Sequence, residues 1–256
     1  MLQAHSWLWH YLWVAPNCLL LFLAYLLWRR ELHKTFPFFF AFCLLAPLGQ
    51  LITYLADLSP SVSPESWWRV LWVTQVVEGF LKLAVVGEIF DHAFSNYAAL
   101  AKLGRLLIRA LGAVLVLTAA VIAALTPNDS RFGIISGAHL LQESIYLIET
   151  GLLVFIFIFA SHFKLRLTRS VVGIALGLAT SACIHLASWA FMANGVLADE
   201  SRQVLDLLNM AAYHVCVLMW WYYLLVPHTV PIIPGGPIPE NNLAVWNREL
   251  ERLLQS

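Results

Sequence analysis

Residues 7–28 read WLWHYLWVAPNCLLLFLAYLLW, and Arg29 and Arg30 follow them directly. This stretch contains no Asp, Glu, Lys or Arg, and roughly 20 apolar residues are enough for a helix to cross the hydrocarbon core of a bilayer. No Lys or Arg occurs in residues 1–6, and the run is longer than the apolar region of a secretory signal. The stretch therefore predicts a retained first membrane span, with the N-terminus outside and the two arginines in the cytoplasm.

The whole chain shares the composition of this first segment. Of its 256 residues, 61% are hydrophobic and 12% are charged, and the mean hydropathy is +0.75. The charged share is about half that of an ordinary soluble domain, which excludes a soluble enzyme and a disordered protein. Lys and Arg number 15, as do Asp and Glu, so the chain has no basic excess for binding nucleic acid. A multi-pass membrane protein remains.

Seven apolar runs are long enough to span a bilayer. They cover residues 7–28, 36–57, 67–90, 106–125, 136–160, 170–193 and 204–226. Charged residues, Pro, Gly and Ser occur between them, and the alternation of polar and apolar residues that strands require is absent. The sequence predicts an all-α membrane protein, a bundle of seven transmembrane helices, with a short interfacial helix over residues 92–105 before the fourth span.

The distribution of Lys and Arg predicts the orientation of this bundle. The basic residues predicted to face the cytoplasm are Arg29, Arg30, Lys34, Lys102, Arg105, Arg109, Lys164, Arg166, Arg169, Arg248 and Arg252. The opposite side has Arg69, Arg131 and Arg202. Because cytoplasmic loops are enriched in Lys and Arg, we expect the N-terminus outside and the C-terminus inside.

Three segments with different roles follow from these patterns. Residues 1–226 form the transmembrane domain, and residues 227–240 are a Pro-rich spacer that cannot be helical. Residues 241–256 are predicted to form a short cytoplasmic amphipathic helix, too short to be stable alone. We expect its apolar face to dock on the membrane, on the bundle or on a cytoplasmic protein partner, through Leu243, Trp246, Leu250 and Leu253.

Ionisable side chains inside membrane spans are costly, so each is a candidate for a functional site. They concentrate in the third, fifth, sixth and seventh runs, which we expect to surround a hydrated cavity that opens outward. Glu78 precedes Lys82 by four residues, which predicts an ion pair on one helix face. The alternative is a polar network that only holds the helices together. The candidate ligand-binding or cavity residues are Glu78, Lys82, His139, Glu143, Glu149, His185, Asp206 and His214.

No pattern in these spans matches a known cofactor, metal or catalytic site. The last span has no Lys for a retinal Schiff base, the histidines are single, and HExxH is absent. We therefore expect no cofactor, no metal and no catalytic residue. Gly173 and Gly177 form a GxxxG pattern that favours close packing of helices within the molecule. No cysteine lies in a CxxC pair or an external loop, so no disulfide is expected for Cys18, Cys43, Cys183 and Cys216.

Over most of residues 1–227 the chain resembles an uncharacterised family of bacterial integral membrane proteins with seven predicted spans. The motifs that carry this resemblance are Arg29-Arg30-Glu31-Leu32-His33 with Phe36-Pro37-Phe38-Phe39, Glu88-Ile89-Phe90 with Tyr97, Leu100 and Leu103-Gly104, and Tyr222-Tyr223-Leu224-Leu225-Val226-Pro227. The resemblance implies the bacterial inner membrane. In outline the chain is also similar to the seven-span sensory regions of bacterial signalling proteins, although it contains no output domain.

Two classes of function agree with these observations, and a third stays open. The first is a membrane-embedded sensor or small-ligand-binding module that acts through a partner. The second is a small transporter or proton-coupled permease subunit, which should show a repeat and broken helices at mid-membrane. The only prolines well inside spans, Pro16 and Pro47, do not lie beside the charge cluster. The third is a structural or assembly subunit of a membrane complex.

Overall fold

The computed structural model describes the backbone of residues 6–95, 97–125, 131–162, 167–193 and 199–226. Within these ranges, no side chain is described at residues 98, 115, 116, 118–120, 122–125, 131–141, 189, 192, 193 and 199–202. The predicted spacer and terminal helix, with Leu243, Trp246, Leu250 and Leu253, lie outside the described residues.

The described part of the chain is helical throughout and contains no strand. Its elements in order are α1 (Trp7–Arg29), η1 (Leu32–Lys34), α2 (Pro37–Leu58), α3 (Pro64–Ala93), α4 (Ala98–Leu125), α5 (Arg131–His162), α6 (Arg169–Ala193) and α7 (Asp199–Leu225). Of the helix predicted over residues 92–105, residues 98–105 are helical and run without a break into the rest of α4. Residues 92 and 93 instead belong to α3.

Local sequence explains where several helices begin. The Ser6 hydroxyl accepts a hydrogen bond from the Trp9 N–H at the start of α1. At the start of α3 the Ser63 hydroxyl accepts from the Ser66 N–H, and Pro64 occupies the first helical position. The start of α2 is capped from a distance, because Glu88 on α3 accepts hydrogen bonds from the Phe38 and Phe39 N–H groups, each at 3.0 Å. A carboxylate is favourable there because the first N–H groups of a helix have no partner within it.

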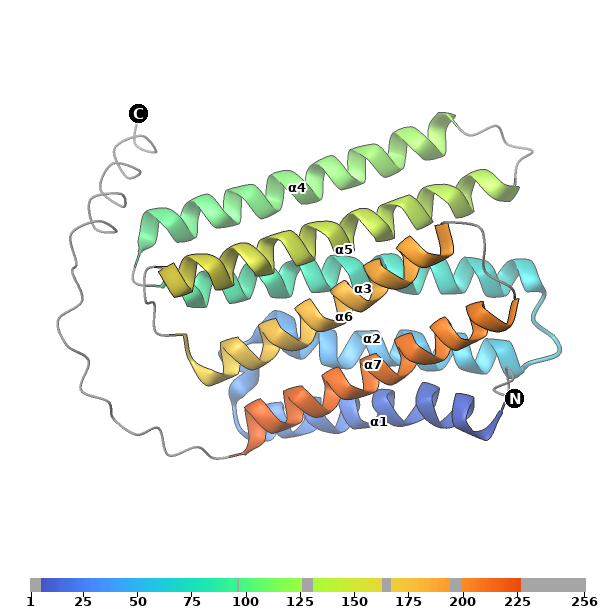
Figure 1. The fold of residues 1–256 in the computed structure, drawn as a ribbon, viewed down its shortest axis with the longest axis horizontal. Helices are drawn as coiled ribbons and strands as arrows, with labels where there is room; N and C mark the ends of the chain where they lie inside the picture. The colour runs from blue at the N-terminus through green and yellow to red at the C-terminus, as the bar shows by residue number, and fades with distance from the viewer. Residues whose placement is uncertain (1–5, 96, 126–130, 163–166, 194–198, 227–256) are drawn as a thin grey trace.

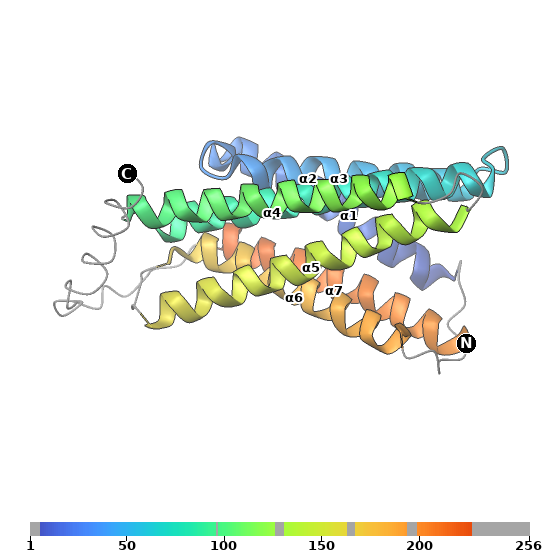
Figure 2. The ribbon, with the colours of Figure 1, turned by 90° about the horizontal axis from the view of Figure 1, so that it is seen from above.

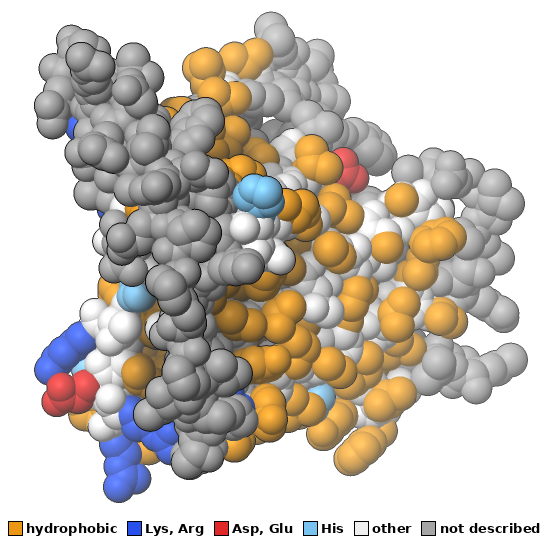
Figure 3. Space-filling model, turned by 60° about the vertical axis from the view of Figure 1, so that its left-hand side comes forward, with side chains coloured by type: hydrophobic (Ala, Val, Ile, Leu, Met, Phe, Trp, Pro, Cys, Tyr) orange, Lys and Arg blue, Asp and Glu red, His pale blue; other side chains and the backbone are white. Residues whose placement is uncertain are grey.

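Six helices are long and apolar enough to cross a membrane, counted over the described residues. They are α1, α2, α3, and the parts Gln142–His162 of α5, Arg169–Ser188 of α6 and Gln203–Leu225 of α7. Several apolar helices of this length are typical of a multi-pass membrane protein. Large apolar side chains cover the flank of the bundle, and Lys and Arg gather at one end of the face in Figure 3. Such a flank contacts lipid rather than water.

Six helices form a closed ring, and α4 lies outside it. Around the ring, α1 packs on α2, α2 on α3, α3 on α5, α5 on α6, α6 on α7, and α7 on α1 (Figure 1). Among the described residues, helix α4 packs against α3 and α5 only, along one side of the bundle (Figure 2). We name the two ends of the bundle by residues of the first helix. Trp9 lies near the start of α1 and marks the Trp9 end, and Arg30 directly follows α1 and marks the Arg30 end.

The half of the bundle toward the Arg30 end has a tightly packed core. Trp220 of α7 is 1% exposed and packs edge-on against Phe39 and Phe42 of α2, with ring centroids 5.4 and 5.7 Å away. Its indole N–H donates to the Ile174 carbonyl oxygen on α6. Other side chains from all six ring helices fill the same region with no exposed surface: Leu20, Leu23, Leu27, Cys43, Val86, Ile89, Leu153, Ile156, Leu178 and Val217.

The GxxxG pattern on α6 serves contacts within the molecule, as predicted. A Cβ atom at Gly173 would collide with Tyr223, and one at Gly177 would collide with the Trp220 ring. The missing side chains allow the large aromatic residues of α7 to lie directly on the α6 backbone.

Candidate functional site

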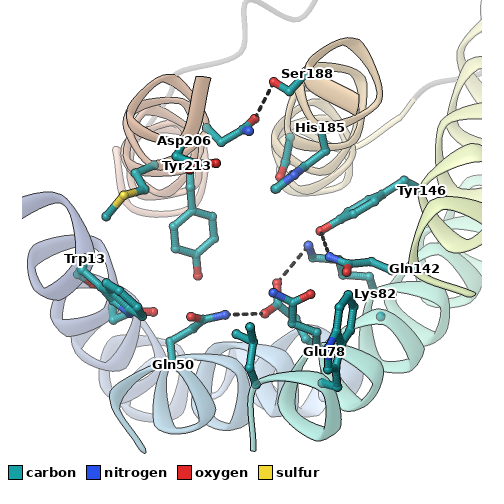
Figure 4. A pocket seen from close by; sticks show the side chains of 18 of the residues that line it. Trp13, Gln50, Glu78, Lys82, Gln142, Tyr146, His185, Ser188, Asp206 and Tyr213 are labelled. Atoms are coloured by element: carbon teal, nitrogen blue, oxygen red, sulfur yellow. Dashed lines mark hydrogen bonds and ion pairs between the residues drawn. The ribbon is translucent and has the colours of Figure 1, made fainter. Parts of the chain in front are cut away.

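A cavity of about 600 Å³ occupies the half of the ring toward the Trp9 end. All six ring helices contribute to its wall, and Figure 4 shows their side chains pointing toward a common centre. The prediction named four helices, and the structure adds α1 and α2. The lining residues are Trp9, Leu12, Trp13, Asn17, Gln50, Trp67, Trp68, Leu71, Trp72, Gln75, Glu78, Gly79, Lys82, Gln142, Ile145, Tyr146, Ser181, His185, Ser188, Asp206, Asn209, Met210 and Tyr213.

The base of the cavity is a buried ion pair on α3. The Lys82 ammonium lies 2.9 Å from Glu78 Oε1, which confirms the pairing predicted from their spacing. The side chain of Lys82 is 3% exposed and that of Glu78 is 14% exposed. The Gln50 amide of α2 donates to the other oxygen, Glu78 Oε2, at 3.2 Å. Both carboxylate oxygens therefore have a donor, which offsets part of the cost of burying the charge.

The wall formed by α5, α6 and α7 is aromatic and hydrogen-bonded. Tyr146 and His185 stack with ring centroids 4.7 Å apart and planes 9° from parallel. The Lys82 ammonium lies 4.9 Å from the centre of the Tyr146 ring, within the range of a cation–π contact. Between α6 and α7, the Ser188 hydroxyl donates to the Asn209 side-chain oxygen at 3.0 Å (Figure 4).

Five indole rings form the wall nearest the Trp9 end. Trp9 and Trp13 come from α1, with ring centroids 4.5 Å apart. Trp67, Trp68 and Trp72 come from α3, and the first two have centroids 4.9 Å apart. By composition alone these residues indicate an interfacial aromatic belt. Trp9 with Trp13, and Trp68 with Trp72, are four residues apart, and this spacing is the signal that also places each pair on one helix face, toward the cavity.

The structure brings four of the eight predicted site residues to the cavity wall: Glu78, Lys82, His185 and Asp206. Glu143, Glu149 and His214 are outside the set of lining residues. The side chain of His139 lies outside the part of the structure that is described. The binding role of all eight residues stays a prediction.

Glu149 has unusual surroundings for a carboxylate inside the bundle. It has no exposed surface, and neither of its oxygens has a hydrogen-bond partner. It lies behind the cavity base, within electrostatic range of Lys82 and Glu78. His214, in contrast, lies near α1, where its ring centroid is 5.7 Å from that of Tyr11.

The search for ionisable groups missed two cavity amides in the first two runs, Asn17 and Gln50. Each is the only Asn or Gln in its apolar run, and that is the signal that could have identified it. The Asn17 amide donates to the Trp13 carbonyl oxygen at 2.6 Å, and its Oδ1 has no partner. No group of three or more His, Cys, Asp or Glu residues suited to a metal ion occurs among the described residues.

Comparison of the chain with protein-family models, with curated proteins and with solved structures finds no match. A function therefore has to be argued from the cavity itself.

Proposed function

We propose that this protein is a membrane-embedded sensor, which binds a small molecule in the cavity and changes its helix packing in response. The observation that carries the proposal is a cavity of about 600 Å³ that ends on the Glu78–Lys82 pair. Most small-molecule sites are concave, largely apolar and equipped with a few polar groups, and this cavity fits that description. A polar network that only held the helices together would not require an adjoining cavity.

The orientation belongs to the same proposal. With seven spans, the N-terminus outside and the C-terminus in the cytoplasm, the Trp9 end faces the periplasm of a bacterial inner membrane. Arg30 and Lys34 then lie on the cytoplasmic side, as the bias of Lys and Arg requires. Helix α4, which contacts α3 and α5 in the described part of the chain, is the seventh span.

Helix α7 offers a route from the cavity to the cytoplasmic tail. Asn209 and Tyr213 line the cavity, and the last carbonyl groups of the same helix are bound by arginines. Arg30 donates to the Leu225 carbonyl oxygen at 3.2 Å, and Arg169 donates to the Val226 oxygen at 2.9 Å. A displacement of α7 would change these contacts. They lie at the end of α7, where the tail that would bind a partner begins.

The packed core of the Arg30 end argues against the transporter alternative. A transporter exposes its site to each side in turn, commonly with broken helices near mid-membrane. The described parts of the ring helices are continuous, and fully buried side chains such as Trp220 and Phe42 fill the region below the cavity. Opening that region would require the separation of a close-packed core.

Cysteine labelling tests the cavity. In a background with the 4 native cysteines replaced by Ala, Gln75→Cys and Met210→Cys should react with a membrane-impermeant maleimide added from outside. Ile89→Cys, in the packed core, is the matched control and should not react. Unreactive cysteines at both cavity positions would exclude a hydrated cavity that opens outward.

Labelling at the other end of the bundle tests the sensor. Val226→Cys, just after α7, should change its reaction rate with a permeant maleimide when Glu78→Gln or Lys82→Met is added. Variants that fold and leave this rate unchanged would overturn the coupling between the cavity and the tail.

A further inference from the structure

The charges and rings that line the cavity indicate which chemical class of ligand it takes, provided that the proposed function holds. Two lining residues, Glu78 and Asp206, are acidic, and one, Lys82, is basic. At the Trp9 end of the cavity the described wall contains no basic residue, and Asp206 of α7 is exposed there. The described wall therefore favours positive charge over negative charge.

The indole wall has the same preference. The face of an aromatic ring carries partial negative charge, and indole binds cations best among the side-chain rings. Two groups of indoles, Trp9 with Trp13 on α1 and Trp67 with Trp68 and Trp72 on α3, line the part of the cavity between its mouth and the ion pair. Such rings favour an organic cation with an apolar body over a hydrated inorganic ion.

Glu149 supplies an independent observation at the base of the cavity. Its carboxylate is fully buried and has no hydrogen-bond partner. It is three residues after Tyr146 on α5, so both side chains lie on the same helix face. The Lys82 ammonium already lies over the Tyr146 ring, 4.9 Å from its centre. Glu149 is therefore available as a second acceptor for Lys82, on a different helix from Glu78.

We propose that the cavity binds an organic cation whose charged nitrogen replaces Lys82 at Glu78, and that Lys82 then pairs with Glu149. With both carboxylates ionised, Glu78, Lys82 and Glu149 sum to one negative charge. A bound monocation brings this sum to zero, which is the favourable state in a medium of low dielectric constant.

The exchange explains how binding would change the bundle. In the described state, the Glu78–Lys82 pair lies within α3. After the exchange, Lys82 joins α3 to α5, next to the Tyr146–His185 stack that contacts α6. Two ion pairs then replace one, and the Lys82–Glu149 pair crosses a helix interface, which moves helices against one another.

Three probes of similar size separate charge from shape. They are benzyltrimethylammonium, its uncharged carbon isostere neopentylbenzene, and the anion benzenesulfonate. Each is added to the full-length protein in phosphatidylcholine nanodiscs, and binding is measured by tryptophan fluorescence and by the rise in Tm that a ligand of the native state produces. The cation should bind about tenfold or more tightly than either other probe, which corresponds to 1.4 kcal/mol.

Variants then locate the charge exchange. Glu78→Gln should remove most of the preference for the cation over its isostere, and Glu149→Gln should weaken cation binding by about tenfold, because Lys82 loses its second acceptor. Glu65→Gln, on the same helix as Glu78 but exposed and outside the cavity lining, is the matched control and should bind like the unchanged protein.

The outcomes distinguish this inference from the proposed function. Equal binding of all three probes, or an unchanged cation preference in Glu78→Gln, would overturn the ligand class while the cavity remains a binding site. Unchanged cation binding in Glu149→Gln would overturn the exchange. If Gln75→Cys and Met210→Cys are also unreactive from outside, the proposed function itself fails.

Discussion

At the scale of single residues, two ion pairs of the same type lie on α3 in opposite surroundings. Glu78 and Lys82 are four residues apart and buried, and Glu65 and Arg69 are four residues apart with side chains 58% and 77% exposed. Their N–O distances are 2.9 and 2.7 Å, so geometry alone does not separate them. Burial separates the two pairs, because water and salt screen the exposed pair and leave the buried pair unscreened.

This contrast leads to a prediction for a pair of double-mutant cycles. Lys82→Met alone should lower the free energy of unfolding by about 3 kcal/mol, because it leaves the Glu78 carboxylate buried without its cation. Adding Glu78→Gln to Lys82→Met should recover a large part of that loss. Reversible unfolding in mixed micelles measures each value.

The exposed pair is the built-in control. The cycle of Glu65→Gln with Arg69→Met should give a coupling energy below about 1 kcal/mol. Equal coupling energies for the two pairs would contradict the assignment of Glu78–Lys82 as a desolvated pair at the base of the cavity.

The residue scale also shows why polarity inside a span does not identify a function by itself. Glu88 is another buried glutamate of α3, but its two oxygens accept the first N–H groups of α2. This role is structural. It depends on where α2 begins relative to α3, which the spacing of residues on α3 does not reveal.

At the scale of elements, the contact between α6 and α7 is set by glycines. Trp220 and Tyr223 lie against Gly177 and Gly173, and a Cβ atom at either glycine would collide with the ring opposite. Close approach of this kind places α7 where Arg169, at the start of α6, can also donate to the Tyr222 carbonyl oxygen.

We predict that Gly177→Ala destabilises the protein by about 1–3 kcal/mol through overpacking against Trp220. Gly151→Ala and Gly112→Ala are matched controls, because nothing lies within 4 Å of a Cβ atom at either position. These two variants should be neutral or stabilising, since Ala favours helix more than Gly does. The Tm of each purified variant provides the comparison, and a Gly177→Ala protein as stable as the controls would refute the tight contact.

At the scale of the whole molecule, the ring divides into a hollow half and a packed half. The cavity reaches from the indole wall down to Lys82, and beyond it fully buried side chains continue toward the Arg30 end. This division would let a ligand bind on one side of a membrane without opening a path across it.

The division predicts a gradient of hydrogen exchange along each ring helix. In nanodiscs, backbone amides of residues 9–17 of α1 should exchange faster than those of residues 20–27, because the first set borders the hydrated cavity and the second the packed core. In α7, residues 206–213 should likewise exchange faster than residues 216–224. Uniform exchange along both helices would show that the cavity is dry.

Much of the fold follows from the sequence because it depends on local properties. Residues 7–28 and 36–57 were predicted as spans, and α1 and α2 run over Trp7–Arg29 and Pro37–Leu58. Apolar length, flanking Arg and an N1 proline act within a few residues of where they occur. The Glu78–Lys82 pair was predictable for the same reason, since a helix places residues four apart side by side.

Only the tertiary structure decided the order of helices around the ring and what lines its centre. Both depend on contacts between residues far apart in the chain. The ring excludes α4, and it brings Trp13 and Gln50 from α1 and α2 to a cavity that charge alone assigned to four other helices. It also places Glu149 behind the cavity rather than in its wall. The periodicity of a sequence shows which face of a helix is polar and which is apolar. Which helix each face contacts is set by packing against the other helices.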